Sequence, residues 1–237
     1  MIIFNNVSKK YGSANQAIFN TSLKINDGEL VFLAGSPGAG KTTFIKLIVG
    51  LDKPDQGQLN VKGRSLSALS YSGLALARRE MGIIMDAFSL FPNLTLEENI
   101  ELPLRITGIT KKEREKKVQD IIEQFGLTQK RHFFGYELPY QEKKLCMTAR
   151  ALVTEPCLII ADEIFDSMLP ENINIITQKI FDLLEKNATA VISLNQVEII
   201  NDLPKRKRLI TFSNGKIIKD EILKDRAEQL EGILDNV

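Results

Sequence analysis

The stretch Gly35–Thr42, GSPGAGKT, constrains the fold more than any other feature of this chain of 237 residues. It matches G-x-x-x-x-G-K-[ST] at every fixed position. Glycines let backbone amides turn toward an anion, and a helix that starts near Gly40 points its positive end at the same place. The pattern predicts a phosphate loop in which Lys41 reaches the β- and γ-phosphates of a nucleotide and Thr42 binds Mg²⁺.

The flanking sequence decides between a phosphate loop and an ordinary glycine-rich turn. A short apolar run, Val31 to Ala34, precedes the loop and is typical of a buried parallel strand. After the loop, apolar residues recur at three- and four-residue steps: Phe44, Leu47, Ile48 and Leu51. This spacing predicts one buried face of a helix, and the order of strand, loop and helix favours the phosphate loop.

A second apolar run, Cys157 to Ala161, ends in two acids, Asp162 and Glu163. A carboxylate at the end of a buried strand can hold the water shell of Mg²⁺, and its neighbour can polarise an attacking water. Acids are common at strand ends. Together with the phosphate loop, however, they predict Asp162 as a Mg²⁺ ligand and Glu163 as a catalytic base.

The first half of the chain combines strands with a helical region. Residues 2–11 and 17–26 alternate apolar and polar positions, which predicts two antiparallel strands. Residues 92–155 predict a mainly helical insert within an α/β frame. Thr95 and Glu98 have the spacing of a capping box, which marks the start of one of its helices.

The second half returns to alternating helix and strand. Residues 170–187 predict an amphipathic helix, and residues 188–195 predict a buried strand. Asn214 and Gly215 predict a hairpin turn, and the charged tail from Leu223 predicts a last helix. These elements indicate a phosphate-loop nucleotide fold of the α/β class.

Composition narrows the functional classes. Lys and Arg number 31 against 30 for Asp and Glu, so no global charge indicates a nucleic-acid partner. Two cysteines, Cys146 and Cys157, and the single His132 do not provide the usual zinc spacings. No apolar run has the length of a membrane span, and the N-terminus predicts a strand rather than a signal peptide. We therefore expect a cytoplasmic protein with two reduced thiols.

The order of these motifs resembles that of the ATP-binding cassette (ABC) family across essentially the whole chain. The likeness is closest to the FtsE type, a cell-division ATPase that works with a membrane partner, in residues 1–51, 78–104, 149–163 and 209–217. Lipoprotein- and macrolide-exporting cassettes share much of it. The resemblance implies one P-loop NTPase domain over residues 1–237: an ABC-type nucleotide-binding domain with a mixed sheet, an antiparallel β part and an α-helical subdomain.

The resemblance also implies roles for single residues. It assigns Tyr11 to the aromatic ring that stacks on adenine, although an ordinary strand-end aromatic is the alternative. It assigns Asp162 to Mg²⁺ and Glu163 to the catalytic base. The contacts with ATP and Mg²⁺ are assigned to the loop: Gly35, Ser36, Pro37, Gly38, Ala39, Gly40, Lys41, Thr42 and Thr43.

Several positions depart from the family pattern. The signature Leu-Ser-Gly-Gly-Gln aligns with Leu138–Glu142, where Pro139 has neither an amide hydrogen nor a hydroxyl group. The glutamine that the family has after the strand at residues 82–85 aligns with Asp86, which can still coordinate Mg²⁺. The switch histidine aligns with Asn195, which can hydrogen-bond a phosphate but cannot carry a proton's charge. The family also has an aspartate in the loop that here precedes Pro170, and this aspartate aligns with Leu169.

These departures lie on one catalytic surface in the family, although neutral drift or misalignment remains an alternative for Asn195 alone. Asp166 lies near Leu169 in the sequence and could substitute in part. Hydrolysis in this family needs two subunits arranged head to tail, so we expect a homodimer or heterodimer in the ATP-bound state. We also expect ATPase activity that is weak or absent.

We therefore expect an ATP-binding subunit at the inner face of the cell membrane, with an integral membrane partner that is FtsX-like or a transporter permease. The alternatives are a non-hydrolysing scaffold or regulator, and the ATPase subunit of a lipoprotein- or macrolide-type exporter. A basic run at residues 204–208 is typical of a solvated loop that connects strands. The alternative is that this run contacts anionic lipid head groups or an acidic loop of a partner.

Overall fold

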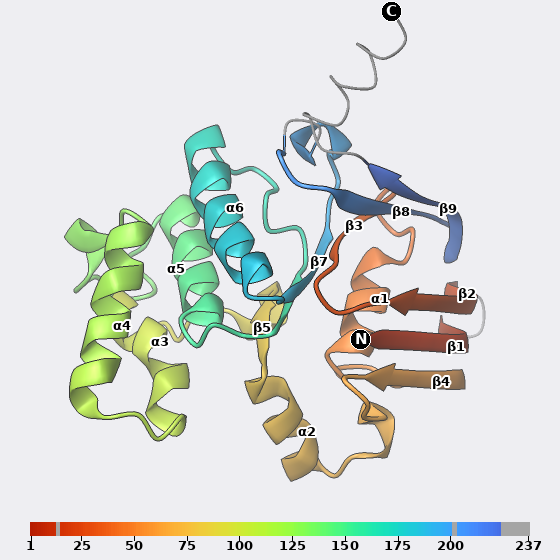
Figure 1. Cartoon of the computed structure of the whole chain (residues 1–237), viewed down its shortest axis with the longest axis horizontal. Coiled ribbons are helices and arrows are strands. Elements are labelled where there is room, and N and C mark those ends of the chain that lie inside the picture. The colour runs from red at the N-terminus through yellow and green to blue at the C-terminus, as the bar shows by residue number, and fades with distance from the viewer. Residues whose placement is uncertain (13–14, 201–202, 224–237) are drawn as a thin grey trace, which may run out of the picture. The chain divides into compact units, whose positions relative to one another are not determined.

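The computed structural model of the chain describes residues 1–12, 15–200 and 203–223 (Figure 1). Residues 224–237 lie outside the described residues, and so does the helix predicted for the charged tail. The chain divides into two compact units. Unit 1 consists of Met1–Ala75, Ala161–Asp166 and the segment from Thr189 onward; unit 2 consists of Leu76–Ile160 and Ser167–Ala188.

Unit 1 contains a three-stranded antiparallel sheet. Strand β1 (Ile2–Tyr11) lies between β2 (Asn15–Ile25) and β4 (Gln56–Val61) and is antiparallel to both. The predicted pairing of the first two strands is therefore confirmed. Strand β4 was not predicted, because only Leu59 and Val61 of its six residues are buried and the apolar signal is short.

Unit 1 also contains four strands of a mixed sheet in the order β7 (Thr189–Ser193), β3 (Leu30–Ala34), β8 (Lys207–Ser213) and β9 (Lys216–Leu223). Strand β3 runs parallel to β7 and β8, while β9 is antiparallel to β8 and confirms the predicted hairpin. Parallel strands end at the same edge of a sheet. The phosphate loop begins at this edge, directly after β3.

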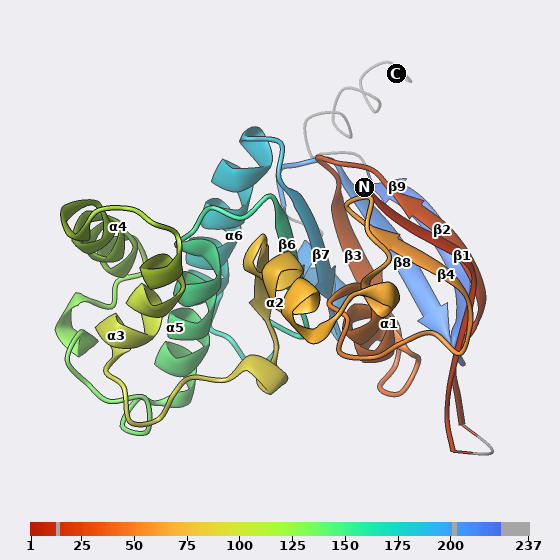
Figure 2. The same ribbon diagram turned by 90° about the horizontal axis from the view of Figure 1, so that it is seen from below.

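Helix α1 (Lys41–Ile48) joins the core of unit 1 through aromatic packing. Phe44 stacks on Phe4 of β1 with ring centroids 4.3 Å apart, and meets the edge of Phe212 of β8 at 5.3 Å. Figure 2 shows α1 beside these strands. Leu51 was predicted on the buried face of this helix, and that prediction is wrong. The helix ends at Ile48, Gly50 turns the chain with φ +68°, and Leu51 is exposed.

Unit 2 is mainly helical. Its elements are α2 (Tyr71–Arg79, which begins in unit 1), β5 (Met81–Ile84), α3 (Leu96–Glu101), α4 (Lys111–Gln124), α5 (Tyr140–Leu152), β6 (Leu158–Ala161, whose last residue belongs to unit 1) and α6 (Pro170–Glu185). Helix α3 packs on α4 and α5, and α5 packs on β5 and α6 (Figure 2). Helix α2 was not predicted.

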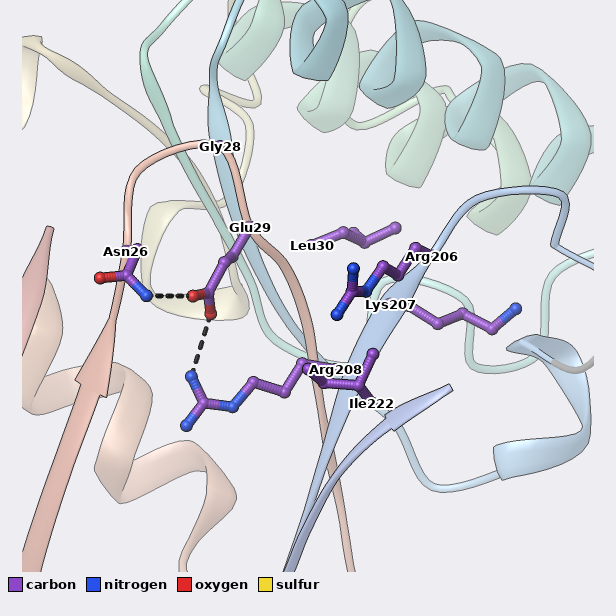
Figure 3. Close-up of a pocket in the computed structure, with 8 residues that line it drawn as sticks. All are labelled: Asn26, Gly28, Glu29, Leu30, Arg206, Lys207, Arg208 and Ile222. Atoms are coloured by element: carbon purple, nitrogen blue, oxygen red, sulfur yellow. Dashed lines mark hydrogen bonds and ion pairs between the residues drawn. The ribbon is translucent and has the colours of Figure 1, made fainter. Parts of the chain in front are cut away.

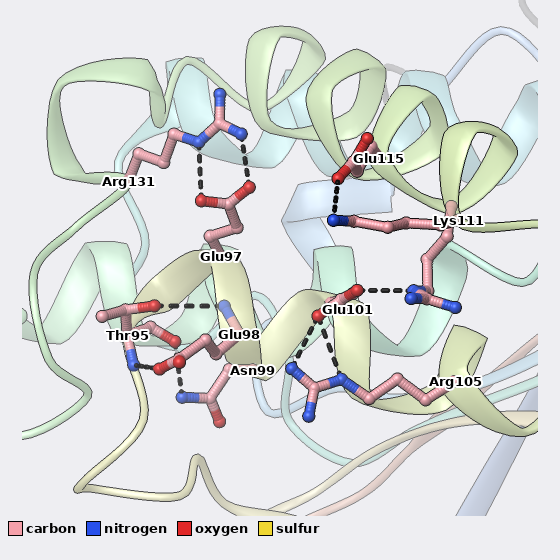
Figure 4. A network of polar contacts seen from close by, with 10 residues as sticks. Thr95, Glu97, Glu98, Asn99, Glu101, Arg105, Lys111, Glu115 and Arg131 are labelled. Atoms are coloured by element: carbon pink, nitrogen blue, oxygen red, sulfur yellow. Dashed lines mark hydrogen bonds and ion pairs between the residues drawn. The ribbon is translucent and has the colours of Figure 1, made fainter.

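Polar contacts hold the start of α3 (Figure 4). The predicted capping box is confirmed: Thr95 Oγ1 accepts a hydrogen bond from Glu98 N at 3.2 Å, and Glu98 Oε2 accepts one from Thr95 N at 2.8 Å. Arg131 donates to both carboxylate oxygens of Glu97, with its Nε at 2.8 Å. These bonds satisfy backbone groups and charges that the first turn of a helix would otherwise leave unpaired.

Candidate phosphate-binding site

The loop between β3 and α1 is shaped by glycines that no other residue could replace without strain. Gly35 has φ +142° and Gly40 has φ +113°. A Cβ at Gly35 would overlap the carbonyl oxygen of Phe212, and a Cβ at Gly40 would overlap that of Ala17. Both overlaps involve backbone atoms, which cannot swing aside. The two glycines therefore let the loop lie directly on the strands beneath it.

Between these glycines the loop has an exposed tip and a buried return. Ser36, Pro37 and Gly38 are exposed, and a Cβ at Gly38 would meet no atom within 4 Å. Ala39 is buried; its amide donates to Ser36 O at 3.0 Å, and its carbonyl accepts from Gly215 N at 3.0 Å. The tip is thus open to a ligand while its base is fastened to the β8–β9 turn.

Lys41 is the first residue of α1, and its side chain turns back to the loop. Only 3% of its surface is exposed, and its Nζ donates to Gly35 O at 2.6 Å, to Ser36 O at 3.3 Å and to Asn195 Oδ1 at 3.0 Å. A buried ammonium group needs such partners to offset the loss of water. These contacts hold the Lys41 ammonium group against the backbone of the loop that is predicted to bind phosphate.

The next residue, Thr42, meets the acid at the end of β6. Its Oγ1 donates to Asp162 Oδ1 at 3.3 Å, and Ser193 Oγ donates to the same oxygen at 2.6 Å. Ser193 Oγ also accepts from the amide of Glu163 at 2.9 Å. Ser193 closes β7, is fully buried and was not predicted as a site residue. Its position at the carboxyl end of a predicted buried strand is the signal that could have identified it.

A hollow of about 190 Å³ opens beside Lys41 and Thr42. Its lining also includes Tyr11, Thr43 and Glu163, with Ala17, Gly38 and Gly40. Glu163 has φ +50°, a left-handed conformation that is uncommon for a residue with a side chain. The hollow thus combines a cation, hydroxyl groups and a carboxylate.

Tyr11 borders the hollow from the end of β1 and is 39% exposed. Its hydroxyl donates to Asp52, a residue that was not singled out from the sequence. Partial burial raises the pKa of Tyr11, and the hydrogen bond with the Asp52 carboxylate raises it further. The ring stays neutral at physiological pH, with a large part of its surface open to solvent.

Asn195 connects Lys41 with a second acid. Its Oδ1 accepts from Lys41 Nζ at 3.0 Å, while its Nδ2 donates to Asp166 Oδ2. A carboxamide can make both bonds at once because it carries a donor and an acceptor, and it does so without changing charge. Asn195 therefore holds Lys41 through a neutral bridge.

The oxygen atoms around Thr42 fit a hard cation. Mg²⁺ usually takes one or two protein oxygens and completes its shell with water and phosphate. The Thr42 hydroxyl and the Asp162 carboxylate meet at 3.3 Å and supply such a pair. No group of three or more His, Cys, Asp or Glu side chains gathers as a metal site among the described residues. Bound Mg²⁺ would neutralise phosphate charge and orient the nucleotide.

A comparison of the sequence with models of known protein families identifies the family of this chain. The sequence model of the ABC transporter family matches residues 18–166, which is more than half of the chain. The chain belongs to the ABC transporter family. The α/β fold, with its mixed sheet and antiparallel part, agrees with this assignment.

The matching relatives include methionine import proteins and cell division proteins. A methionine import ATP-binding protein, MetN 2 of Paraburkholderia xenovorans, is 35% identical over 207 residues, which cover 85% of this chain and 54% of the relative. A cell division ATP-binding protein, FtsE of Streptococcus pneumoniae, is 31% identical over 93% of this chain and 95% of the relative. The chain thus spans about half of that methionine import protein and nearly all of that cell division protein.

Solved ABC structures share the fold. A dimeric ATP-binding cassette, MJ0796, in a post-hydrolysis state with ADP and phosphate, superposes with a TM-score of 0.85 at 27% identity, over 94% of this chain and 99% of that one. Another dimeric structure of the same cassette gives a TM-score of 0.86 at the same identity and coverage.

The segment aligned with the ABC signature lies in unit 2, at the start of α5. Pro139 is the N-cap residue and offers no side-chain hydrogen bond to the helix. The Gln141 side chain donates to Ser167 O at 2.7 Å. It also accepts from Leu169 N at 3.3 Å and from Asn172 Nδ2 at 3.0 Å. The Gln141 side chain therefore fastens α5 to the start of α6.

Asp86 also lies in unit 2. It is exposed and begins a short 3-10 helix, Asp86–Phe88, after β5. Its assignment as a Mg²⁺ ligand stays a prediction. No helix among residues 1–12, 15–200 and 203–223 has both the length and the apolar character to cross a membrane.

Proposed function

We propose that the chain binds Mg-ATP at the loop Gly35–Thr43. The observation that carries this proposal is the meeting of buried Lys41, Thr42 and Asp162 at the amino end of α1, beneath an exposed glycine tip. A helix amino end, backbone amides and a fixed ammonium group together favour a polyphosphate, and the oxygen pair favours Mg²⁺. Tyr11 borders the same hollow and would receive the adenine ring.

We propose slow hydrolysis rather than brisk turnover. Glu163 lines the hollow and is the candidate base that polarises water. Asn195 occupies the switch position with a neutral amide that already bonds Lys41. Pro139 has no amide hydrogen to offer to a phosphate across a dimer interface. A missing transition-state donor costs about two to three orders of magnitude in rate, roughly 3 kcal/mol.

The assembly that fits these features is a membrane-associated ABC complex of the FtsE type, with residues 1–237 as one ATP-binding domain and residues 92–155 as its helical subdomain. The match to nearly the full length of a cell division ATP-binding protein supports this type. The dimeric cassettes of the same fold support a homodimer or heterodimer with ATP bound.

An integral membrane partner, FtsX-like or a transporter permease, would place the chain at the inner face of the cell membrane. Unit 2 exposes aromatic side chains that suit a protein contact: Phe91, Phe133, Phe134 and Tyr136. The rings of Phe134 and Tyr136 are parallel, with centroids 5.6 Å apart. Exposed aromatic clusters are enriched at protein interfaces.

A second function is favoured by the neutral bridge at Asn195 and by the cap at Pro139. A non-hydrolysing scaffold or regulator would use ATP to order the chain or its partner, without turnover. Equilibrium binding of labelled ATP and a phosphate-release assay separate the possibilities.

The first experiment tests nucleotide binding. Lys41→Ala should bind labelled ATP at least about a hundredfold more weakly than the parent chain, because a charged bond to phosphate is lost. Lys46→Ala removes a charge from the same helix and should bind like the parent. Equal affinity of Lys41→Ala and the parent would exclude the loop as the ATP site.

The second experiment compares phosphate release by the parent and Glu163→Gln under steady-state conditions. Turnover that disappears in Glu163→Gln supports an enzyme with Glu163 as its base. Indistinguishable traces at the background rate support the scaffold.

A further inference from the structure

The basic run at residues 204–208 is only in part the solvated loop that its composition favoured: residues 204–206 lie outside any strand, with Pro204 and Arg206 exposed. Its last two residues, Lys207 and Arg208, open strand β8. Lys207 is only 3% exposed, and its Nζ donates to Leu203 O at 2.8 Å. Arg208 pairs with Val31 of β3, and Lys207 pairs with Leu223 of β9, contacts that the charge pattern alone does not reveal.

A pocket of about 510 Å³ lies at this end of unit 1 (Figure 3). Its walls come from Asn26 and Glu29 before β3, from Leu30, from Arg206 and Arg208, and from Ile222. The volume is within the range of small-molecule sites, about 300–1,000 Å³. Apolar and charged groups share the lining, so the pocket suits a ligand with both characters.

The strand register separates this pocket from the phosphate loop. Arg208 pairs with Val31 of β3 on one side and with Ile222 of β9 on the other, which aligns the three strands at the pocket. At the opposite end of β3 and β8, Gly35 lies against Phe212. A ligand in the pocket would therefore not compete with a nucleotide at the loop.

The charges of the pocket are not all balanced. Arg208 donates to Glu29 Oε2 at 3.0 Å and to both carboxylate oxygens of Asp220 at 2.7 Å. The hydrogen bonds with these two acids raise the pKa of Arg208, and Asp220 has the larger effect. Arg206 is exposed and has no hydrogen bond or ion pair with any other residue that the structure describes. Figure 3 shows its guanidinium group turned toward the part of the pocket that Glu29 and Arg208 line. Among residues 1–12, 15–200 and 203–223, therefore, no acid pairs with this cation at the cavity.

We propose that this pocket binds a small organic anion: a carboxylate, sulfonate or phosphate group attached to an apolar body. Arg206 would hold the anionic group, because a guanidinium forms paired hydrogen bonds with such oxygens. Leu30 and Ile222 would contact the apolar body. Glu29 keeps Arg208 and Asn26 in place, with Asn26 Nδ2 donating to it at 2.5 Å.

The test is a fluorescence titration of the full chain with 8-anilinonaphthalene-1-sulfonate, an aromatic sulfonate. The parent should bind it in one saturable class that Mg-ATP does not displace. Arg206→Ala should weaken binding by at least about tenfold through loss of the charged bonds. Lys205→Ala, the matched loss of one charge outside the pocket lining, should leave the affinity unchanged.

The neutral analogue N-phenyl-1-naphthylamine should bind the parent more weakly than the sulfonate and should not respond to Arg206→Ala. Equal weakening in the two variants would show general charge attraction and overturn the proposal. Displacement by Mg-ATP, or the lack of any saturable binding, would also overturn it. Vesicles that contain phosphatidylglycerol and displace the probe would reassign the pocket to a lipid head group. None of these outcomes depends on ATP hydrolysis.

Discussion

The phosphate loop of unit 1 and the segment Leu138–Glu142 of unit 2 are both helix starts, and they differ in what their residues do. At the start of α1, glycines leave backbone groups open while Lys41 lies buried beneath them. At the start of α5, Pro139 withholds an amide hydrogen and Gln141 uses its side chain to bond α6. The first helix start is the proposed anion site, whereas the second holds neighbouring segments through a side chain.

The side chain of Gln141 gives this helix start a structural role. A glycine at position 141 would leave Ser167 O and Leu169 N without the partners that Gln141 provides. The segment Leu138–Glu142 therefore has local hydrogen bonds made by a side chain. Stability and catalysis therefore make opposite demands on this helix start.

The largest expected effect is in the loop. Gly40→Ala should destabilise the chain by about 3–5 kcal/mol, because the new Cβ would overlap Ala17 O at φ +113°. Gly63→Ala is the matched control, since Gly63 has φ +77° but no atom within 4 Å of a Cβ; it should cost about 1 kcal/mol. Urea unfolding measures both. Equal costs would show that the loop is not packed against the strands as described.

A smaller effect is expected at the signature segment. Gln141→Ala removes bonds to Ser167, Leu169 and Asn172 and should cost about 1–2 kcal/mol in the free energy of unfolding. Gln178→Ala removes one exposed bond within α6, to Asp182 at 2.9 Å, and should change stability by less than about 0.5 kcal/mol. If the two variants unfold alike, Gln141 does not fasten the helices, and the contrast with the loop fails.

The smallest effect concerns the helical region alone. Hydrogen bonds from Arg131 lower the pKa of Glu97, so the folded state holds its carboxylate charged to a lower pH than the unfolded state does. The resulting stability is fully present above the unfolded pKa and is lost as the pH falls through the lowered folded pKa.

Arg131→Met should therefore cost about 1 kcal/mol or less at pH 7. The gap between variant and parent should close below about pH 4. Urea unfolding at several pH values measures this gap. A gap that stays constant from pH 7 to pH 3 would show that the ion pair contributes nothing specific.

Much of the site could be predicted because a phosphate loop needs fixed residues at fixed spacing. Lys41 and Thr42 follow from that rule, and Asp162 follows from the acids at the end of a predicted buried strand; the structure places the Asp162 carboxylate beside the Thr42 hydroxyl. Ser193 and Gln141 could not be found in this way, since their partners lie tens of residues away and only folding brings them close.

The fold shows the same limit. The long periodic helix α6 was predicted, whereas β4 was missed because only two of its residues are buried. The basic run was predicted only in part: residues 204–206 lie in a loop, as their charge suggests, whereas Lys207 is buried and Arg208 pairs with Val31 of a strand far away in the sequence.

One measurement tests the central claim most directly. The chain, in excess over Mg-ATP labelled at the γ-phosphate, is followed for bound nucleotide and released phosphate in a single turnover. We predict that the nucleotide binds and stays intact long after binding is complete, and that Lys41→Ala holds none. Phosphate released as fast as ATP binds, or no retained ATP in the parent chain, would contradict the claim that this protein holds a triphosphate tightly and breaks it slowly.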